Sequence, residues 1–229
     1  MVAITAWAGA LRIDDYCAFW SGSIGDAVPH RHFAAQAVHS DTPVTVIDGG
    51  GKRLVGRCLL IEPHALHRIL PTAWAELWFV EPSVAFGEPE AMKKRIESAD
   101  PIIVSAEQGH SFWESWLTRG RPRTLDARVA HALPAIDRLI AMGVVRLADA
   151  AKESGLSPGR FRHLFAAQVG MPFQRYVLWR RMRVAFDALG EHRTATDAAH
   201  AAGFSDSAHF ARSIKAMFGV RASDLLFEQ

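Results

Sequence analysis

One pattern occurs twice in the C-terminal half of the chain, and it constrains the fold more than any other feature. Each copy has a pair of alanines, three further residues, a Gly, an apolar residue and a Ser, then two apolar residues at helical spacing and a final Gly. The copies span residues 150–170 and 198–219. Small residues, a turn glycine and an apolar plug are what two helices need to meet at a steep angle. The repeat therefore predicts two pairs of crossed helices, at about 147–169 and 195–218.

The second helix of each pair is expected to bury one face and expose the other. Ser157 before Pro158 is a strong helix start, and Ser205 can cap the matching helix of the second copy. Apolar residues at positions 161, 164 and 165, and at 210, 214 and 217, fall on the faces that we expect to be buried. The remaining positions carry small and basic side chains, which suits entry of a helix into the major groove of DNA.

A long helix from residue 172 to about 189 is expected to connect the two pairs. If it holds the two outer helices about 34 Å apart on one side, both can enter the major groove of the same duplex. Arg175, Arg180, Arg181 and Arg183 of this connecting helix are candidates for contact with DNA phosphates. An exposed basic helix face explains these arginines equally well.

Residues 126–226 resemble the DNA-binding domain of the AraC/XylS family, in which one helix joins two helix-turn-helix units. The resemblance covers the Ser157, Phe161 and Phe165 spacing, the run Gly170-Met171-Pro172-Phe173, and Gly203-Phe204-Ser205-Asp206 with the residues that follow. It implies base contacts at positions matching Gly159, Arg162 and His163, and Ser207, Ala211 and Arg212. The DNA-contacting set that we predict is Ser157, Arg160, Arg162, His163, Ser207, His209, Arg212, Lys215 and Arg181. The chain departs from the family in its tail, residues 221–226, where we expect a last helix with a less rigid start.

The first half of the chain has a different pattern. Apolar runs at 44–47, 54–61 and 74–80 are rich in Val, Ile and Trp and are separated by turn signals, which favours strands in a small barrel or sandwich. From residue 88 the spacing becomes helical, with helices expected at 89–98 and 107–117. Basic residues with Gly and Pro at 119–125 indicate a linker.

Four polar residues of the first half form a candidate site. Histidines two apart on a strand share a face, so His30 and His32 can both point inward beside His67. The run from Gly25 through His30 and His32 to Gln36 resembles the first metal-binding motif of cupin barrels, with Gln where Glu is usual. The sequence around His67 resembles a degenerate second motif. The resemblance implies an effector pocket or a site for a divalent metal, and histidines with ordinary surface or hydrogen-bonding roles remain the alternative.

Together these patterns predict an α+β protein. Residues 1–118 form a cupin-like β-barrel or sandwich with two helices, 119–125 a linker, and 126–229 an all-α double helix-turn-helix domain. Residues 126–229 carry 14 Lys and Arg against 10 Asp and Glu, a weak excess in favour of a polyanionic partner. Cys17 and Cys58 alone cannot form a four-cysteine zinc site, and with no secretory leader they fit the cytoplasm.

The resemblance implies a sequence-specific transcription regulator and no enzyme. Its expected partners are promoter DNA, a small-molecule effector bound by the first half, RNA polymerase if it activates transcription, and a second copy of itself in a homodimer. No membrane is expected. The alternative is a metal-dependent cupin enzyme that carries a DNA-binding domain. The effector, the operator sequence and the sign of regulation are not encoded in any pattern of the sequence.

Overall fold

The computed structural model describes residues 6–13, 17–81, 90–106, 112–118, 124–143, 145–191, 193–221 and 225–227. The chain divides into two compact units, one of residues 1–122 with 211–229 and the other of residues 123–210. This division differs from the predicted domain boundaries at the C-terminal end, because residues 211–229 group with the first unit. Most of the predicted linker, residues 119–123, lies outside the described part of the chain.

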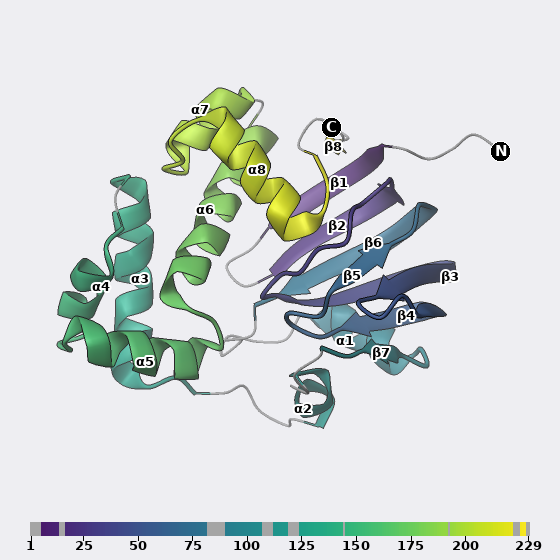
Figure 1. Ribbon diagram of the computed structural model, residues 1–229, viewed down its shortest axis with the longest axis horizontal. Coiled ribbons are helices and arrows are strands. Elements are labelled where there is room, and N and C mark those ends of the chain that lie inside the picture. Colours follow the sequence, from purple (N-terminus) through teal and green to yellow (C-terminus); the bar gives the residue numbers. More distant parts are fainter. Residues whose placement is uncertain are drawn as a thin grey trace. The chain divides into compact units, whose positions relative to one another are not determined.

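The first unit is built on one sheet of eight strands (Figure 1). The strands are β1 (Trp7–Ile13), β2 (Cys17–Ile24), β3 (Ala35–Asp48), β4 (Arg53–Ile61), β5 (His67–Ile69), β6 (Thr72–Val80), β7 (Ile102–Val104) and β8 (Leu225–Phe227). Their order across the sheet is β7, β4, β3, β6, β2, β1, β8, and β5 pairs with β3 off this path. Only the pairs of β7 with β4 and of β8 with β1 are parallel among the described strands.

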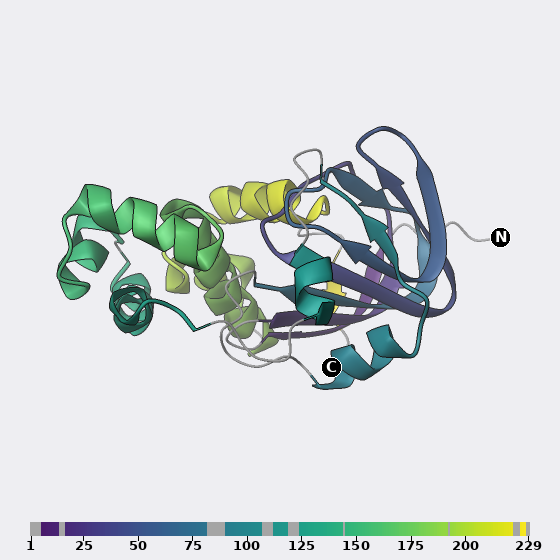
Figure 2. The same cartoon turned by 90° about the horizontal axis from the view of Figure 1, so that it is seen from below.

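The long strand β3 gives the sheet its curvature. Its register with β4 shifts between His39 and Val44, so the strand bends there. The part before the bend pairs with β6, and the part after it pairs with β5. Figure 2 shows the strands of this unit curving round. Because of this curvature the short strand β5 brings His67 opposite His30, with which it forms an isolated bridge.

Two helices contribute side chains to the core of the first unit. They are α1 (Glu90–Glu97) and α2 (Phe112–Thr118). Met92, Ile96, Trp113 and Trp116 are buried in one cluster with sheet residues that include Trp78. The buried Glu62 side chain accepts hydrogen bonds from the first two backbone amides of α2, at 2.8 and 3.0 Å. This carboxylate satisfies amide donors that the start of a helix leaves without partners.

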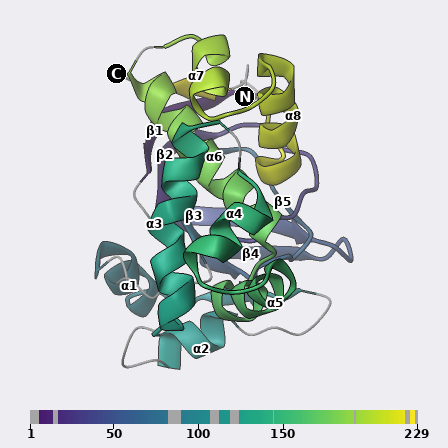
Figure 3. The same cartoon turned by 90° about the vertical axis from the view of Figure 1, so that its left-hand side faces the viewer.

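The C-terminal helices follow the predicted order. They are α3 (Ala127–Ala141), α4 (Leu147–Glu153), α5 (Pro158–Val169), α6 (Phe173–Gly190), α7 (Ala195–Ala201) and α8 (Ser207–Phe218). The first five lie in the second unit, and Figure 3 shows α3 and α6 running alongside each other. Among the described residues, no helix is long and apolar enough to span a bilayer.

Three parts of the secondary structure differ from the expectation. The strand predictions at 44–47, 54–61 and 74–80 are confirmed, but β1 and β2 lie in a segment for which we predicted no strands. Strand β7 lies where helical spacing was expected, between the two predicted helices. The tail does not continue as a helix, since residues 225–227 form β8 beside β1. β7 pairs with β4 and β8 with β1, so for these two strands pairing with a segment distant in sequence decides the conformation.

Candidate nucleic-acid interface and histidine site

The first helix-turn-helix unit consists of α4, a turn at Gly155 and α5. Gly155 has a left-handed backbone (φ 67), which a side chain would strain. Ser157 is the N-cap of α5, and its side chain accepts a hydrogen bond from the Arg160 amide at 3.4 Å. Phe161 and Phe165 are fully buried, with ring centres 5.9 and 5.5 Å from that of Phe173 in α6.

The opposite face of α5 is exposed, as the sequence predicted. Arg160, Arg162 and His163 are all exposed, and so is the cap residue Ser157. A buried aromatic face beneath an exposed basic one is what a helix needs to be held firmly while it presents donors to a nucleic acid.

The second helix-turn-helix unit consists of α7, a turn at Gly203 and α8. Phe204 and Phe210 are buried with ring centres 5.2 Å apart, and Phe210 also lies 6.1 Å from Phe186 of α6. On α8, Arg212 and Lys215 are exposed, whereas the other two predicted DNA-contacting residues, Ser207 and His209, are half-buried. The repeat seen in the sequence thus corresponds to two similar structural units.

The N-terminus of α8 is capped by a different residue from the one we expected. The Asp206 carboxylate accepts a hydrogen bond from the His209 amide at 2.6 Å. Ser205 instead donates its hydroxyl proton to the same carboxylate at 3.0 Å. Asp is as good a cap as Ser, and its charge also interacts favourably with the helix dipole, so the neighbouring residue takes the role.

Arg180 and Arg181 of α6 donate hydrogen bonds to residues of the second unit. Arg180 is buried and donates to both oxygens of Asp137, at 2.8 and 2.7 Å, so it is not the phosphate contact that we considered. Arg181 is half-buried and donates to the Gly143 carbonyl at 3.2 Å. Desolvation lowers the pKa of Arg181. Arg175 of the same helix is exposed.

The histidine site of the first unit brings together all four residues that the sequence singled out. One ring nitrogen from each of His30, His32 and His67 lies within 4.8 Å of the others, and all three side chains are buried. The Gln36 side-chain oxygen lies 3.1 Å from Nε2 of His32 and 3.0 Å from Nε2 of His67. Three imidazoles and an amide oxygen form a donor set that suits divalent transition metals.

The backbone orients each of these rings. Nδ1 lies within hydrogen-bonding distance of a carbonyl two residues away, at 3.0 Å for His30, 2.7 Å for His32 and 2.9 Å for His67. Burial lowers the pKa of His30 to about 3, with the neighbouring His32 as a second cause. Burial is also the main cause that lowers the pKa of His32 and of His67. The rings are therefore neutral, with one nitrogen anchored by the backbone, which is the form in which histidine binds a metal.

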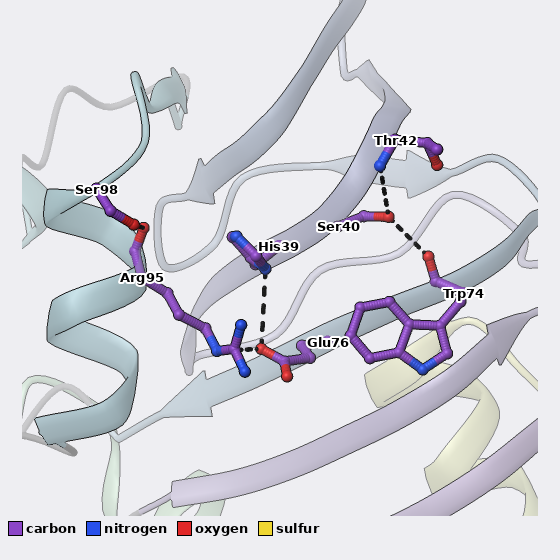
Figure 4. Close-up of polar contacts among 7 residues, drawn as sticks. All are labelled: His39, Ser40, Thr42, Trp74, Glu76, Arg95 and Ser98. Atoms are coloured by element: carbon purple, nitrogen blue, oxygen red, sulfur yellow. Dashed lines mark hydrogen bonds and ion pairs between the residues drawn. The ribbon is translucent and has the colours of Figure 1, made fainter.

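A second polar cluster of this unit was not predicted (Figure 4). The buried Glu76 carboxylate lies 2.7 Å from Nε of Arg95 and 3.8 Å from Nδ1 of His39. A cavity of about 390 Å³ is lined by His39 and by the charged residues Asp41, Arg57 and Asp100. Charges of both signs around one cavity suit a small polar molecule. No sequence motif joins these residues, since they come from three strands, from α1 and from the segment after it.

Comparison with known proteins agrees with this architecture. Residues 150–226 match a family model described as a helix-turn-helix domain. Over 101 residues the chain is 31% identical to the transcriptional activator RhrA of Rhizobium meliloti (strain 1021), a match that covers 43% of this chain and 32% of that protein. The matched segment therefore spans about a third of the relative's length.

Two solved structures share the fold over most of the chain. ToxT from Vibrio cholerae O395 superposes with a TM-score of 0.54 at 10% identity and covers 92% of this chain and 97% of its own. Wild-type ToxT from Vibrio cholerae strain SCE256, solved with an unsaturated fatty acid bound, gives a TM-score of 0.52 at 10% identity, with 92% and 94% covered. At such low identity the likeness shows the fold alone.

Proposed function

We propose that the whole protein is a sequence-specific transcription regulator of the AraC type, because residues 150–226 match a helix-turn-helix domain model and resemble the DNA-binding domain of that family. The observation that carries the proposal is the repeated unit, in which a buried aromatic plug holds a helix whose exposed face is basic. Two such helices double the length of DNA sequence that one chain can read. A regulator of this kind acts on the chromosome, so the proposal implies a cytoplasmic protein.

We assign base reading to the exposed basic residues in the middle of α5 and α8. Arg162 and Arg212 can each donate two hydrogen bonds to guanine, and a contact of this kind discriminates against other bases by about 1–3 kcal/mol. His163 and Lys215 lie beside them on the exposed faces. Residues near the helix starts can bind phosphate, where backbone amides and the helix dipole favour an anion. They are Ser157 and Arg160 on α5, and Ser207 and His209 on α8.

The test is a selection from randomised DNA with the wild type, Arg162→Ala and Arg212→Ala. Each variant should lose preference at its own base pair, by about 5- to 150-fold. Arg53→Ala is the matched control, because Arg53 is an exposed arginine on a strand of the sheet. It should keep the wild-type preference at every position. Selection of no sequence by the wild type, or an unchanged preference in both α5 and α8 variants, would contradict the proposal.

The first unit supplies regulation in this proposal. The histidine site is its binding site for an effector, and a homodimer and RNA polymerase are the protein partners that a promoter-bound activator requires. A ligand that binds the folded protein raises its melting temperature, so thermal scans with candidate effectors test the sensing role. The same three histidines favour one alternative, a metal-dependent enzyme. Stoichiometric iron in untagged protein, together with oxygen consumption on a small substrate, would establish that alternative instead.

A further inference from the structure

The segment that carries His30 also contacts the end of α8. The Val28 amide donates a hydrogen bond to the Gly219 carbonyl at 2.9 Å. The Val28 carbonyl in turn lies 3.0 Å from Nδ1 of His30. All of these residues, and Arg212 and Lys215 of α8, belong to the first unit. One backbone residue therefore stands between a ring of the histidine site and the end of the helix that presents these basic residues.

Gly219 fits this position because it lacks a side chain. Its backbone is left-handed (φ 72), and it ends α8 by donating its amide proton to the Lys215 carbonyl. A Cβ at this position would clash with Nδ1 of His30 and would lie 2.6 Å from the Val28 carbonyl oxygen. The backbone at the end of the helix thus packs directly against the His30 ring. We call this the Val28–Gly219 contact.

A second contact runs in parallel through aromatic rings. Phe218, the last residue of α8, lies with its ring centre 5.3 Å from that of Phe79 on β6. Phe79 in turn lies 5.3 Å from His32 in an edge-to-face arrangement. Two consecutive residues at the end of α8 are therefore connected to two different histidines of the site.

Closing the histidine site around an ion requires movement of the rings. A metal bonded to imidazole nitrogens at about 2.0–2.1 Å in tetrahedral geometry holds those nitrogens roughly 3.4 Å apart. The three nitrogens here lie within 4.8 Å of one another, so a pair near that limit must come closer when an ion binds. His30 cannot move without changing its packing against Gly219 and its hydrogen bond to Val28.

Gln36 allows the site to exist in two states. A neutral histidine has one N–H group, and in each ring of the site a backbone carbonyl can accept it at Nδ1. With its amide nitrogen turned inward, Gln36 can donate to Nε2 of His32 and of His67 at once. With its oxygen turned inward, Gln36 offers a fourth metal ligand. A glutamate could not satisfy both rings without an ion, so the glutamine suits reversible binding.

We propose that a divalent transition metal bound by His30, His32, His67 and Gln36 controls the end of α8 through the Val28–Gly219 contact, and thereby controls DNA affinity. This inference rests on the proposed function and identifies its effector. Metal and DNA are then linked ligands. By thermodynamic reciprocity, the factor by which metal changes the dissociation constant for DNA equals the factor by which DNA changes the dissociation constant for metal.

The test uses the full-length protein, Zn²⁺ and Co²⁺ as probes, and Mg²⁺ as a hard-cation control. We expect one Zn²⁺ or Co²⁺ per chain, no competition by Mg²⁺, and a change of at least about fivefold in affinity for the selected DNA. Gln36→Glu should tighten metal binding, because a carboxylate replaces a neutral ligand. Hydrogen exchange of the wild type, which needs no variant, should show altered protection at the Val28 amide and at the end of α8 when metal is added.

Two glycine variants distinguish the effect of disturbing the Val28–Gly219 contact from the effect of backbone strain. Gly219→Ala should bind metal more weakly, because its Cβ would displace the His30 ring, and it should lose the effect of metal on DNA affinity even when metal saturates the site. Gly155→Ala is the matched control, since Gly155 has the same left-handed backbone (φ 67) but no atom within 4 Å of the place that a Cβ would take. It should keep the effect of metal. Circular dichroism tests whether both variants fold. If Gly219→Ala does not fold, the hydrogen-exchange data on the wild type test the proposal instead.

The outcomes distinguish the two proposals. If DNA is bound specifically but no metal binds, or if metal binds without changing DNA affinity and the exchange of Val28, the inference is wrong and the proposed function stands. If metal binds stoichiometrically and no DNA sequence is selected with or without it, the proposed function is wrong. Equal loss of the metal effect in Gly155→Ala and Gly219→Ala would overturn the role of the contact.

Discussion

The two recognition helices, α5 and α8, follow one sequence pattern but end in different surroundings. Each ends at a glycine with left-handed backbone, Gly170 (φ 80) and Gly219 (φ 72). Each glycine donates its amide proton to the carbonyl four residues earlier, so the local caps are the same. Gly170 is exposed, however, whereas Gly219 is buried against Val28 and His30.

The helix starts differ as well. In the first copy the N-cap of α4 is Arg146, which makes no side-chain cap hydrogen bond, whereas in the second copy α7 begins with a capping box between Thr194 and Asp197. Ser157 caps α5 with a neutral hydroxyl, whereas Asp206 caps α8 with a carboxylate. The two copies of the motif therefore share the buried aromatic residues and the turn glycine, whereas the residues at the ends of their helices differ. In our proposal regulation acts on the second copy, which ends at the Val28–Gly219 contact.

The largest effects should come from the buried plugs that the two copies share. Phe161→Ala and Phe210→Ala each remove a buried aromatic ring, and such changes lower the free energy of unfolding by about 3–5 kcal/mol. Chemical denaturation of the two variants measures both costs. Phe161→Leu and Phe210→Leu are the controls and should cost less, because most of the buried volume is kept. A cost near zero for either alanine variant would show that its copy does not have the packed core described here.

The next effect concerns Arg181, which we predicted from the sequence to contact phosphate. Its guanidinium group donates to the Gly143 carbonyl, and NH2 lies 3.4 Å from the Cβ position of Gly203 in the turn of the second copy. We expect Arg181→Ala to lower the free energy of unfolding by about 0.5–1.5 kcal/mol, since a part-buried hydrogen bond is lost. Arg181→Lys keeps the charge but not the planar fork, and should restore only part of the stability.

Salt dependence of DNA binding separates this positioning role from a phosphate contact. Arg175→Ala is the control, because Arg175 is exposed on the same helix, and its loss should reduce the salt slope by about one. Arg181→Ala should leave the slope unchanged. If Arg181→Ala reduced the salt slope and left the stability unchanged, Arg181 would contact phosphate, as the sequence suggested.

Sequence reasoning succeeded where a pattern is local and failed where distant segments meet. The helix from Pro158 to Val169 follows from Ser157, Pro158 and the apolar spacing, all within one segment. The spacing of His30, His32 and Gln36 pointed to the histidine site, but our reason was wrong, because both histidines lie between β2 and β3 and not on a strand. The isolated bridge between His30 and His67 brings the rings together instead. Strand β8 and the Val28–Gly219 contact could not, because each joins segments far apart in the sequence.

A smaller difference is expected between the caps of α5 and α8. The bond from the Arg160 amide to Ser157 is long, at 3.4 Å, whereas the bond from the His209 amide to Asp206 is 2.6 Å and has a charged acceptor. Ser157→Ala and Asp206→Ala should each cost about 0.5–2 kcal/mol, with Asp206→Ala at the upper end. Asp206→Asn keeps an acceptor without the charge and should fall between them. An equal cost for the two alanine variants would contradict a special role for the charge.

The smallest effect is a pH dependence that only the second copy should show. The Asp197 carboxylate accepts hydrogen bonds from the Thr194 hydroxyl at 2.6 Å and from the Thr194 amide at 3.3 Å, and these bonds lower the pKa of Asp197 below its usual value of 3.8. A depressed acid contributes stability above the unfolded-state pKa and loses it as pH falls through the lower folded-state value. The stability difference between wild type and Asp197→Asn should therefore shrink as denaturation is repeated from pH 6 down to about pH 3.

The first copy offers the matched control for this measurement. Asp149→Asn removes an acidic side chain from the first turn of α4, where no side-chain bond caps the helix. Because no cap depends on that carboxylate, the stability difference between wild type and Asp149→Asn should be small throughout the same pH range. A difference that shrinks equally in both variants would mean that the general loss of negative charge at acid pH, which affects every carboxylate, explains the loss of stability. If the stability difference shrinks only for Asp197→Asn, the capping box is the cause of the pH dependence.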